Sequence, residues 1–138
     1  MASIRRQISI AAGPRAVWNT LTTADGWMSW YADDARLDAR KGGRVVLTIE
    51  DDEGEPVEEV GTFHTFRPTR RLEISWDRVS PAVTKGTQLS FTIARDGEET
   101  RVNLVHSGGG VLDDEDARAE LDKTWRQALS ALRDALEG

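Results

Sequence analysis

The chain has 138 residues, the length of one compact domain, and we expect residues 1–138 to form a single domain around one core. It contains no cysteine, which excludes disulfide scaffolds, zinc ribbons, iron–sulfur proteins and cysteine nucleophiles. A formal net charge of -6 argues against nonspecific binding to nucleic acid, and the chain lacks the run of roughly 20 apolar residues that crosses a bilayer. We therefore expect no nucleic-acid partner and no membrane insertion. The start also lacks the apolar centre of a signal peptide, so we expect a cytoplasmic location.

The N-terminal third of the chain predicts one strand followed by two short helices. Apolar residues alternate with polar ones from Ile4 to Ile10, which is the period of a half-buried strand. Pro14 suits the first turn of a helix that runs to about Leu21. Aromatic side chains at three- and four-residue spacing predict a second short helix over residues 24–31.

The middle of the chain alternates with period two and predicts a meander of antiparallel strands. The strands are expected at about residues 45–50, 57–66, 72–76, 89–93 and 102–106. Acidic residues around Gly54 and the pair Asp96-Gly97 mark two of the turns. In the second of these strands, strict alternation places Glu58, Val60, Thr62, His64 and Phe66 on one face, with His64 toward the concave side of the sheet.

From about Asp114 to Glu137 the apolar period becomes that of one long amphipathic helix. Its apolar stripe consists of Leu121, Trp125, Ala128, Leu129, Leu132 and Leu136. Asp113 or Asp114 can cap the first turn. Together the elements predict an α+β helix-grip fold, in which a curved antiparallel sheet of about six or seven strands, two short helices and the long C-terminal helix enclose a cavity.

Five segments, spread in order over nearly the whole chain, carry a recognisable pattern. They are AAGPRAVWNTLTTADGWMSWY, KGGRVVL, GTFHTFRPTRRLEISW, ETRVNLVHSG and TWRQALSALRDALEG. The pattern resembles the START-like, or SRPBCC, superfamily, and most of all the branch named after the activator of the heat-shock chaperone ATPase. Thr124 departs from it, since glycine is usual before the tryptophan of the last segment. The resemblance implies the helix-grip fold. It leaves the activity open, because this superfamily includes carriers, cyclases, receptors and cochaperone-like proteins.

The predicted cavity would be lined by aromatic and aliphatic side chains from the strands and the last helix. The predicted ligand-binding residues are Trp30, Leu47, His64, Phe66, Ile74, Trp76, Phe91, Leu104, His106, Trp125, Leu129 and Leu132. A lining rich in aromatic rings would favour a flat apolar ligand. The alternative is that the rings of Trp30, Trp76, Phe91 and Trp125 only fill the core.

His64 and His106 are the two histidines of the chain, and we expect both to face the cavity. Imidazole titrates near neutrality, so they could orient a ligand or exchange a proton with it, and the alternative is two histidines with a purely structural role. Since only Glu58 lies nearby as a third ligand, we predict no metal site, and we predict no cofactor. The chain has no Gly-x-Ser-x-Gly, kinase or zinc-protease motif, so we predict no standard catalytic residues.

These observations favour binding of a small hydrophobic or aromatic molecule by a carrier, sensor or sequestering protein. A cyclase-type enzyme acting on a polyketide-like substrate is one alternative, with a histidine moving the proton. A module that contacts proteins, as the resemblance to the chaperone activators implies, is the other. Contact with a chaperone or with a second copy of the chain therefore stays open.

Overall fold

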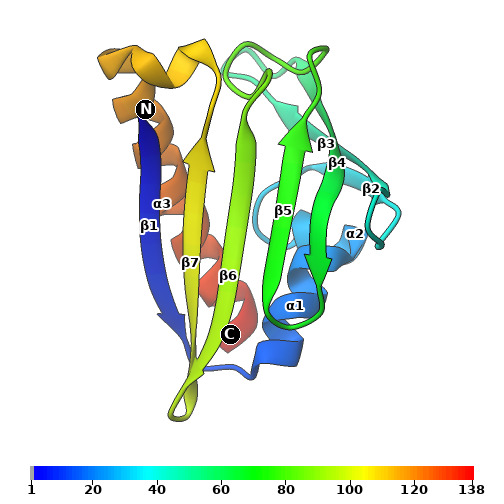
Figure 1. Ribbon diagram of the computed structural model, residues 1–138, viewed down its shortest axis with the longest axis vertical. Helices are drawn as coiled ribbons and strands as arrows, with labels where there is room; N and C mark the ends of the chain where they lie inside the picture. The colour runs from blue at the N-terminus through cyan, green and yellow to red at the C-terminus, as the bar shows by residue number, and fades with distance from the viewer. Residues whose placement is uncertain (1) are drawn as a thin grey trace.

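Seven antiparallel strands form one sheet in the computed structural model, which describes residues 2–138 (Figure 1). The elements in chain order are β1 (Ser3–Ile10), α1 (Pro14–Thr22), α2 (Ala24–Met28), β2 (Asp34–Leu37), β3 (Arg44–Glu50), β4 (Pro56–Arg67), β5 (Arg71–Trp76), β6 (Gln88–Asp96), β7 (Glu99–Ser107), the 3₁₀ turn η1 (Gly110–Asp113) and α3 (Glu115–Glu137). The strand order across the sheet is β1-β7-β6-β5-β4-β3-β2. This arrangement confirms the predicted α+β helix-grip fold.

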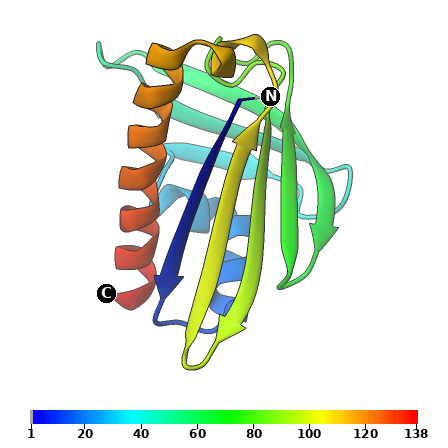
Figure 2. The same ribbon diagram turned by 60° about the vertical axis from the view of Figure 1, so that its left-hand side comes forward.

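The two short helices connect the two edges of the sheet. β1 pairs with β7 at one edge, and α1 and α2 carry the chain across to β2 at the other edge. All three α-helices lie on the same side of the sheet, and α3 runs beside β1 (Figures 1 and 2). The apolar faces of the strands and of α3 therefore bury one another, as the sequence pattern required.

The predicted second helix is shorter than expected, and the strand after it was not predicted. α2 ends at Met28, and the amides of Tyr31 and Ala32 then both donate to the carbonyl oxygen of Trp27 at 3.0 Å. β2 follows with only four residues, which is too short for its alternation to be distinguished from a loop. The segment with aromatic residues at helical spacing is thus a short helix followed by a turn. Together they place Trp27 and Trp30 in the core.

A bulge in β4 makes the predicted orientation of His64 wrong. The pairing of β4 with β5 shifts between Phe63 and Thr65, so that His64 is an extra residue on its strand. Before the bulge, the inward face of β4 is therefore formed by odd-numbered residues, with Phe63 fully buried. The His64 side chain is 63% exposed and points away from the core. Strict alternation could not place both Phe63 and Phe66 against the core, and the bulge does so.

A glycine makes room for Trp76. Gly61 on β4 pairs directly with Trp76 on β5, and a Cβ atom at position 61 would lie 2.7 Å from the indole ring. Trp76 can therefore pack down into the core, where it is 4% exposed. Any side chain at position 61 would displace this ring.

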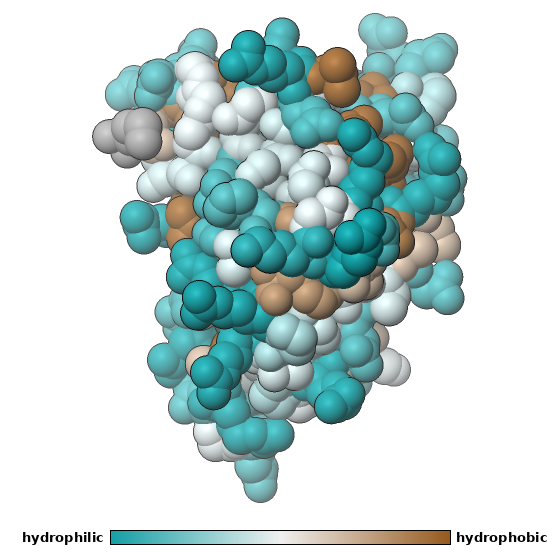
Figure 3. All heavy atoms as spheres, turned by 45° about the vertical axis from the view of Figure 1, so that its right-hand side comes forward, coloured by the Kyte–Doolittle hydropathy of each residue, from teal (hydrophilic) through white to brown (hydrophobic). Residues whose placement is uncertain are grey.

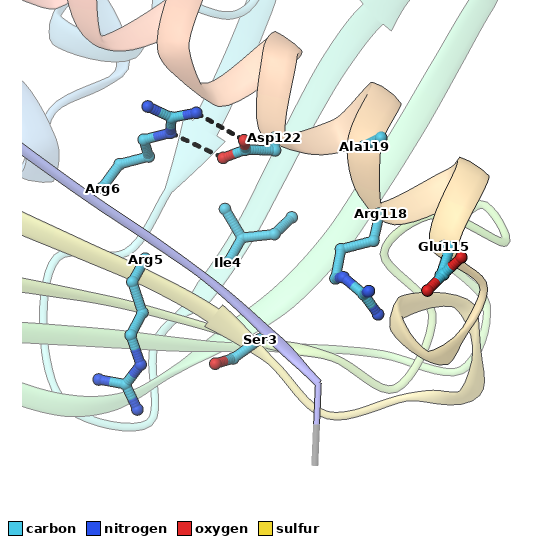
Figure 4. A pocket seen from close by; sticks show the side chains of 8 residues that line it. All are labelled: Ser3, Ile4, Arg5, Arg6, Glu115, Arg118, Ala119 and Asp122. Carbon is cyan, nitrogen blue, oxygen red and sulfur yellow. Dashed lines mark hydrogen bonds and ion pairs between the residues drawn. The ribbon is translucent and has the colours of Figure 1, made fainter.

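α3 is packed unevenly along its length. Its buried residues are Trp125, Ala128, Leu129 and Leu132. The Asp114 side chain caps the helix by accepting hydrogen bonds from two backbone amides, which confirms one of the two predicted caps. In its first half, α3 is joined to β1 by a bidentate ion pair between Arg6 and Asp122, with N–O distances of 2.7 and 2.5 Å (Figure 4).

The outer face of the sheet is polar. Its central strands present mainly small uncharged residues outward, including Ser75, Ser90, Thr92 and Asn103. Hydrophobic residues form small separate groups on the side of the molecule drawn in Figure 3. No helix in the described part of the chain is long and apolar enough to span a membrane.

Candidate ligand-binding pocket

A pocket of about 510 Å³ opens between the sheet and the first half of α3. Its walls come from the β3–β4 hairpin, the loop between β5 and β6, the turn after α2, and α3. Figure 2 shows that hairpin and that loop gathered near the N-terminal end of α3. The lining side chains are Tyr31, Ile49, Glu50, Asp51, Asp52, Val57, Glu59, Pro81, Val83, Thr84, Ala117, Glu120, Leu121, Thr124 and Trp125.

Hydrogen bonds between side chains and the backbone hold the two loops that shape this pocket. The Ser80 hydroxyl donates to the carbonyl of Val60 at 2.8 Å and accepts from the Val60 amide at 3.0 Å, so the β5–β6 loop is fastened to β4. At the tip of the hairpin, one Asp51 carboxylate oxygen accepts from the amides of Glu53 and Glu55 at 2.9 Å each. The hairpin tip is thus held by contacts within itself, and the β5–β6 loop is held by its contact with β4.

Glu59 is a buried acid in the wall of the pocket, with 2% of its surface exposed. Its carboxylate accepts a hydrogen bond of 2.9 Å from the Tyr31 hydroxyl. Burial raises the pKa of Glu59 from 4.5 to about 7, although hydrogen bonds from Tyr31 and Thr84 oppose the rise. Burial, and then the charge of Glu59, raise the pKa of Tyr31 well above 10. Near neutral pH this carboxyl group is therefore poised to gain or lose a proton.

The ring of Tyr31 stacks on the ring of Trp125, with centroids 5.3 Å apart and planes within 9° of each other. Trp125 lines the pocket and also reaches into the core, where its indole Nε1–H donates to Nδ1 of His106 at 3.0 Å. The aromatic pair therefore separates the pocket from a second buried polar group.

His106 lies at the centre of a hydrogen-bond chain with a fixed direction. Because Nδ1 accepts from Trp125, the proton of the neutral ring is on Nε2, which lies 2.8 Å from the Thr87 hydroxyl oxygen. That hydroxyl donates in turn to the carbonyl of Thr84 at 2.6 Å. Burial lowers the pKa of His106 from 6.5 to about 4, so the ring is neutral at pH 7. Both ring nitrogens are engaged with protein groups, which leaves neither free for a ligand.

Most of the predicted site residues lie in the packed core and not in the pocket. Buried there are Trp30, Leu47, Ile74, Trp76, Phe91, Leu104, His106, Trp125, Leu129 and Leu132. Phe66 is half-buried against the core and meets the ring of Trp18 edge-on at 4.9 Å. His64 lies on the outer surface. Of the predicted residues, Trp125 lines the pocket described here.

Glu59 and Tyr31 line the pocket but are not among the residues that the sequence pattern predicts for the site. Glu59 was assigned to the outer face because the alternation of β4 was continued through the position of the bulge. The available signal was the pair Phe63 and Phe66, since two aromatic residues three apart in one strand both face the core only if the strand bulges between them. Tyr31 was expected on a helix, and the turn after α2 places it over Glu59 instead.

Two further hollows each contain one ion pair in their walls. One of about 380 Å³ lies between β1 and α3, and Figure 4 shows the Arg6–Asp122 ion pair at its edge. Another of about 420 Å³ lies on the outer face of the sheet, where Glu73 accepts hydrogen bonds from Arg71 and Gln88. Among residues 2–138, no three His, Asp or Glu side chains are grouped so as to hold a metal ion.

The chain resembles known proteins in sequence and in fold. Residues 11–137 match the family model described as activator of Hsp90 ATPase homolog 1-like protein. The solution structure of the Aha1 dimer from Colwellia psychrerythraea superimposes with a TM-score of 0.82 at 25% identity, covering 99% of this chain and 97% of that one. No protein of curated function matches the sequence.

Two other solved structures share the fold at lower identity. The AHSA1-like protein from Aeromonas hydrophila has a TM-score of 0.77 at 19% identity, with 97% of this chain and 92% of that chain covered. The crystal structure of CalU16 from Micromonospora echinospora has a TM-score of 0.73 at 23% identity, with 97% and 75% covered. At these identities the likeness establishes the fold alone.

Proposed function

The chain belongs to the family of activator of Hsp90 ATPase homolog 1-like proteins, and we propose that it binds a small, largely apolar molecule in its pocket, as a carrier, sensor or sequestering protein. The binding place is the pocket between the β3–β4 hairpin, the β5–β6 loop and the first half of α3. It shares Trp125 with the cavity that the sequence predicts between the sheet and the C-terminal helix, and its other lining residues are not among the predicted binding residues.

The lining of the pocket is the observation that carries this proposal. Ile49, Val57, Val83, Leu121 and Trp125 supply an apolar surface around a volume of about 510 Å³. Ligand sites in proteins are typically clefts of about 300–1,000 Å³ with mainly apolar walls and a few placed polar groups. In this pocket, Glu59 and the Tyr31 hydroxyl are the polar groups positioned to orient a ligand.

The geometry favours binding over a reaction driven by histidine. A cyclase in which His106 moves a proton would need one free ring nitrogen at the substrate. Trp125 and Thr87 occupy both nitrogens, and the low pKa keeps the ring neutral. His64 is outside the pocket. The cyclase alternative would therefore have to rest on Glu59 as the proton-transferring group.

A protein-contact role stays a second proposal. The relative from Colwellia psychrerythraea is described as a dimer, and its fold covers this chain almost completely. β1 and β2 are the edge strands through which a second copy could add to the sheet. Size-exclusion chromatography with light scattering tests the homodimer, because a monomer at all concentrations would exclude it.

Native mass spectrometry of the protein purified from its own host tests the binding proposal first. We expect a mass excess that disappears when the same sample is denatured. Adding the neutral fluorescent probe N-phenyl-1-naphthylamine to ligand-free protein should give saturable fluorescence. A bare chain together with no saturable probe binding would contradict the proposal.

A pair of neighbouring variants locates the binding place. Thr124 lines the pocket from α3, so Thr124→Trp should fill part of it and weaken probe binding about tenfold. Lys123 is exposed and lies outside the lining, so Lys123→Trp adds the same ring without blocking the pocket. Equal losses in both variants would show that the probe binds elsewhere.

A further inference from the structure

The charged side chains of the pocket all have one sign. Its lining contains five carboxylate residues, Glu50, Asp51, Asp52, Glu59 and Glu120. Within the described chain, neither arginine, lysine nor histidine contributes to the same lining. A cavity that combines apolar walls with charges of a single sign concentrates ions of the opposite sign.

Two buried carboxylates of this protein show how unusual the surroundings of Glu59 are. Glu73, on the outer face, receives hydrogen bonds from Arg71 at 3.1 Å and from Gln88 at 3.0 Å. There the hydrogen bonds from Thr65 and Arg71 outweigh burial and lower the pKa of Glu73. Glu59 is more deeply buried, yet the groups described against it are the hydroxyls of Tyr31 and Thr84, which carry no charge.

Burying a carboxylate without a cation costs desolvation free energy. This free energy is recovered when the carboxylate binds a proton or a positively charged partner. In the ligand-free pocket the proton is available, and burial accordingly raises the pKa of Glu59 to about 7. A cationic group placed at the carboxylate would relieve the same cost and form a charge-assisted hydrogen bond. The rings of Tyr31 and Trp125 in the same wall provide further attraction for a cation.

We propose that the ligand of this pocket is an organic cation, an apolar and preferably aromatic body that carries a protonated amine, with Glu59 as its ionic anchor. This inference rests on the proposed binding function and adds the chemical class of the ligand. The apolar part lies against Ile49, Leu121 and Trp125, and the ammonium group reaches Glu59. The carboxylates on the β3–β4 hairpin and Glu120 on α3 draw the cation toward the entrance.

Three probes of one shape separate charge from apolar contact. They are 2-naphthylmethylamine, which is an ammonium ion at pH 7, 2-naphthylmethanol, which is neutral, and 2-naphthoic acid, which is an anion. Isothermal titration calorimetry on the wild-type protein should give the ammonium probe at least about tenfold tighter binding than the alcohol. The acid should bind more weakly than the alcohol.

The possible outcomes distinguish the cation inference from the binding proposal. Equal binding of the amine and the alcohol, or tighter binding of the acid, would overturn the cation inference while leaving the pocket as a binding site. Failure of all three probes would overturn the binding proposal as well. The wild-type comparison stands by itself, so it is informative even if a variant at Glu59 does not fold.

Glu59→Gln then tests the anchor. The variant keeps the size and hydrogen-bonding capacity of the side chain and removes its charge, so the preference for the amine over the alcohol should fall to less than about threefold. Glu120→Gln, at the entrance, is the matched control and should lower the affinity for the amine by only about twofold. An undiminished preference in a folded Glu59→Gln variant would show that another group binds the cation.

Proton release provides a second readout. The titratable groups around Glu59 are Tyr31 and the carboxylates of Glu50, Asp51, Asp52 and Glu120. Glu59 itself has a pKa raised to about 7, so binding of the ammonium probe at pH 7 should release a fraction of a proton. Calorimetry in two buffers of different ionisation enthalpy measures it. The alcohol should release none, and release by the amine should vanish in Glu59→Gln.

Discussion

The two halves of α3 make different contacts. The second half, from Trp125 onward, places Ala128, Leu129 and Leu132 in the core under the sheet, while residues 115–124 contain no buried side chain. Those first residues form a wall of the pocket and are joined to β1 by the ion pair of Arg6 with Asp122. Trp125 stands at the boundary and belongs to both regions.

The buried titratable groups on the two sides of this boundary differ in the same way. His106, on the core side, makes hydrogen bonds through both nitrogens and is neutral. Glu59, on the pocket side, faces two hydroxyls and an open volume. A buried polar group whose bonds are all made within the protein stabilises the fold, whereas one that faces a cavity retains capacity for a ligand.

Removing the core histidine should have the largest effect on stability. His106→Leu leaves the indole Nε1–H of Trp125 without an acceptor and removes one of the two hydrogen bonds of the Thr87 hydroxyl, which we expect to cost about 3–4 kcal/mol of unfolding free energy. Urea denaturation followed by tryptophan fluorescence measures it. His64→Leu is the control, and it should cost less than about 1 kcal/mol because His64 is exposed. Similar losses in both variants would contradict the structural role of His106.

The pH dependence of stability should separate the two groups next, because their pKa values move in opposite directions. His106 has a pKa of about 4 in the folded state instead of 6.5, so between these values the unfolded chain holds more protons and its contribution to stability rises with pH. Glu59 has a pKa of about 7 instead of 4.5, so the folded chain holds more protons and its contribution falls as pH rises. Each contribution amounts to roughly 3 kcal/mol over its range, and the two largely cancel between about pH 5 and 6.

Single variants should reveal these opposite dependences of the unfolding free energy on pH. Relative to wild type, Glu59→Gln should gain stability as pH rises from 4.5 to about 7, and His106→Gln should lose stability as pH rises from about 4 to 6.5. Denaturant titrations at several pH values measure the differences, in which the contributions of all other groups cancel. Curves parallel to wild type in both variants would show that neither group has a displaced pKa.

The smallest effect is expected at the ion pair that holds the first half of α3. Both partners are about one-third exposed, so Arg6→Gln should lower the free energy of unfolding only slightly in urea denaturation, and this loss should shrink in about 1 M salt. Lys123→Gln, an exposed neighbour on the same helix, should be near neutral. If Arg6→Gln cost as much as a core substitution, the two halves of α3 would not differ in the way described above.

The elements with a strong hydrophobic period could be predicted from the amino-acid sequence. The stripe of α3, its cap at Asp114 and the alternating strands of the meander define an α+β sheet closed by one helix, and the segment pattern indicated the family. These features could be read locally because burial of one face imposes a period on the residues of a single element. The identities of most core residues followed from the same period.

The directions of the polar side chains and the position of the pocket depend on contacts between distant segments. One inserted residue at His64 exchanges the faces of β4, turning that histidine outward and Glu59 inward, and periodicity does not reveal such an insertion. The contact of Tyr31 with Glu59 joins residues 28 positions apart through a turn that the helical spacing concealed. The walls of the pocket come from segments that lie far apart in the sequence. The local pattern of one segment does not show which other segments it contacts, so the pocket could not be predicted from periodicity.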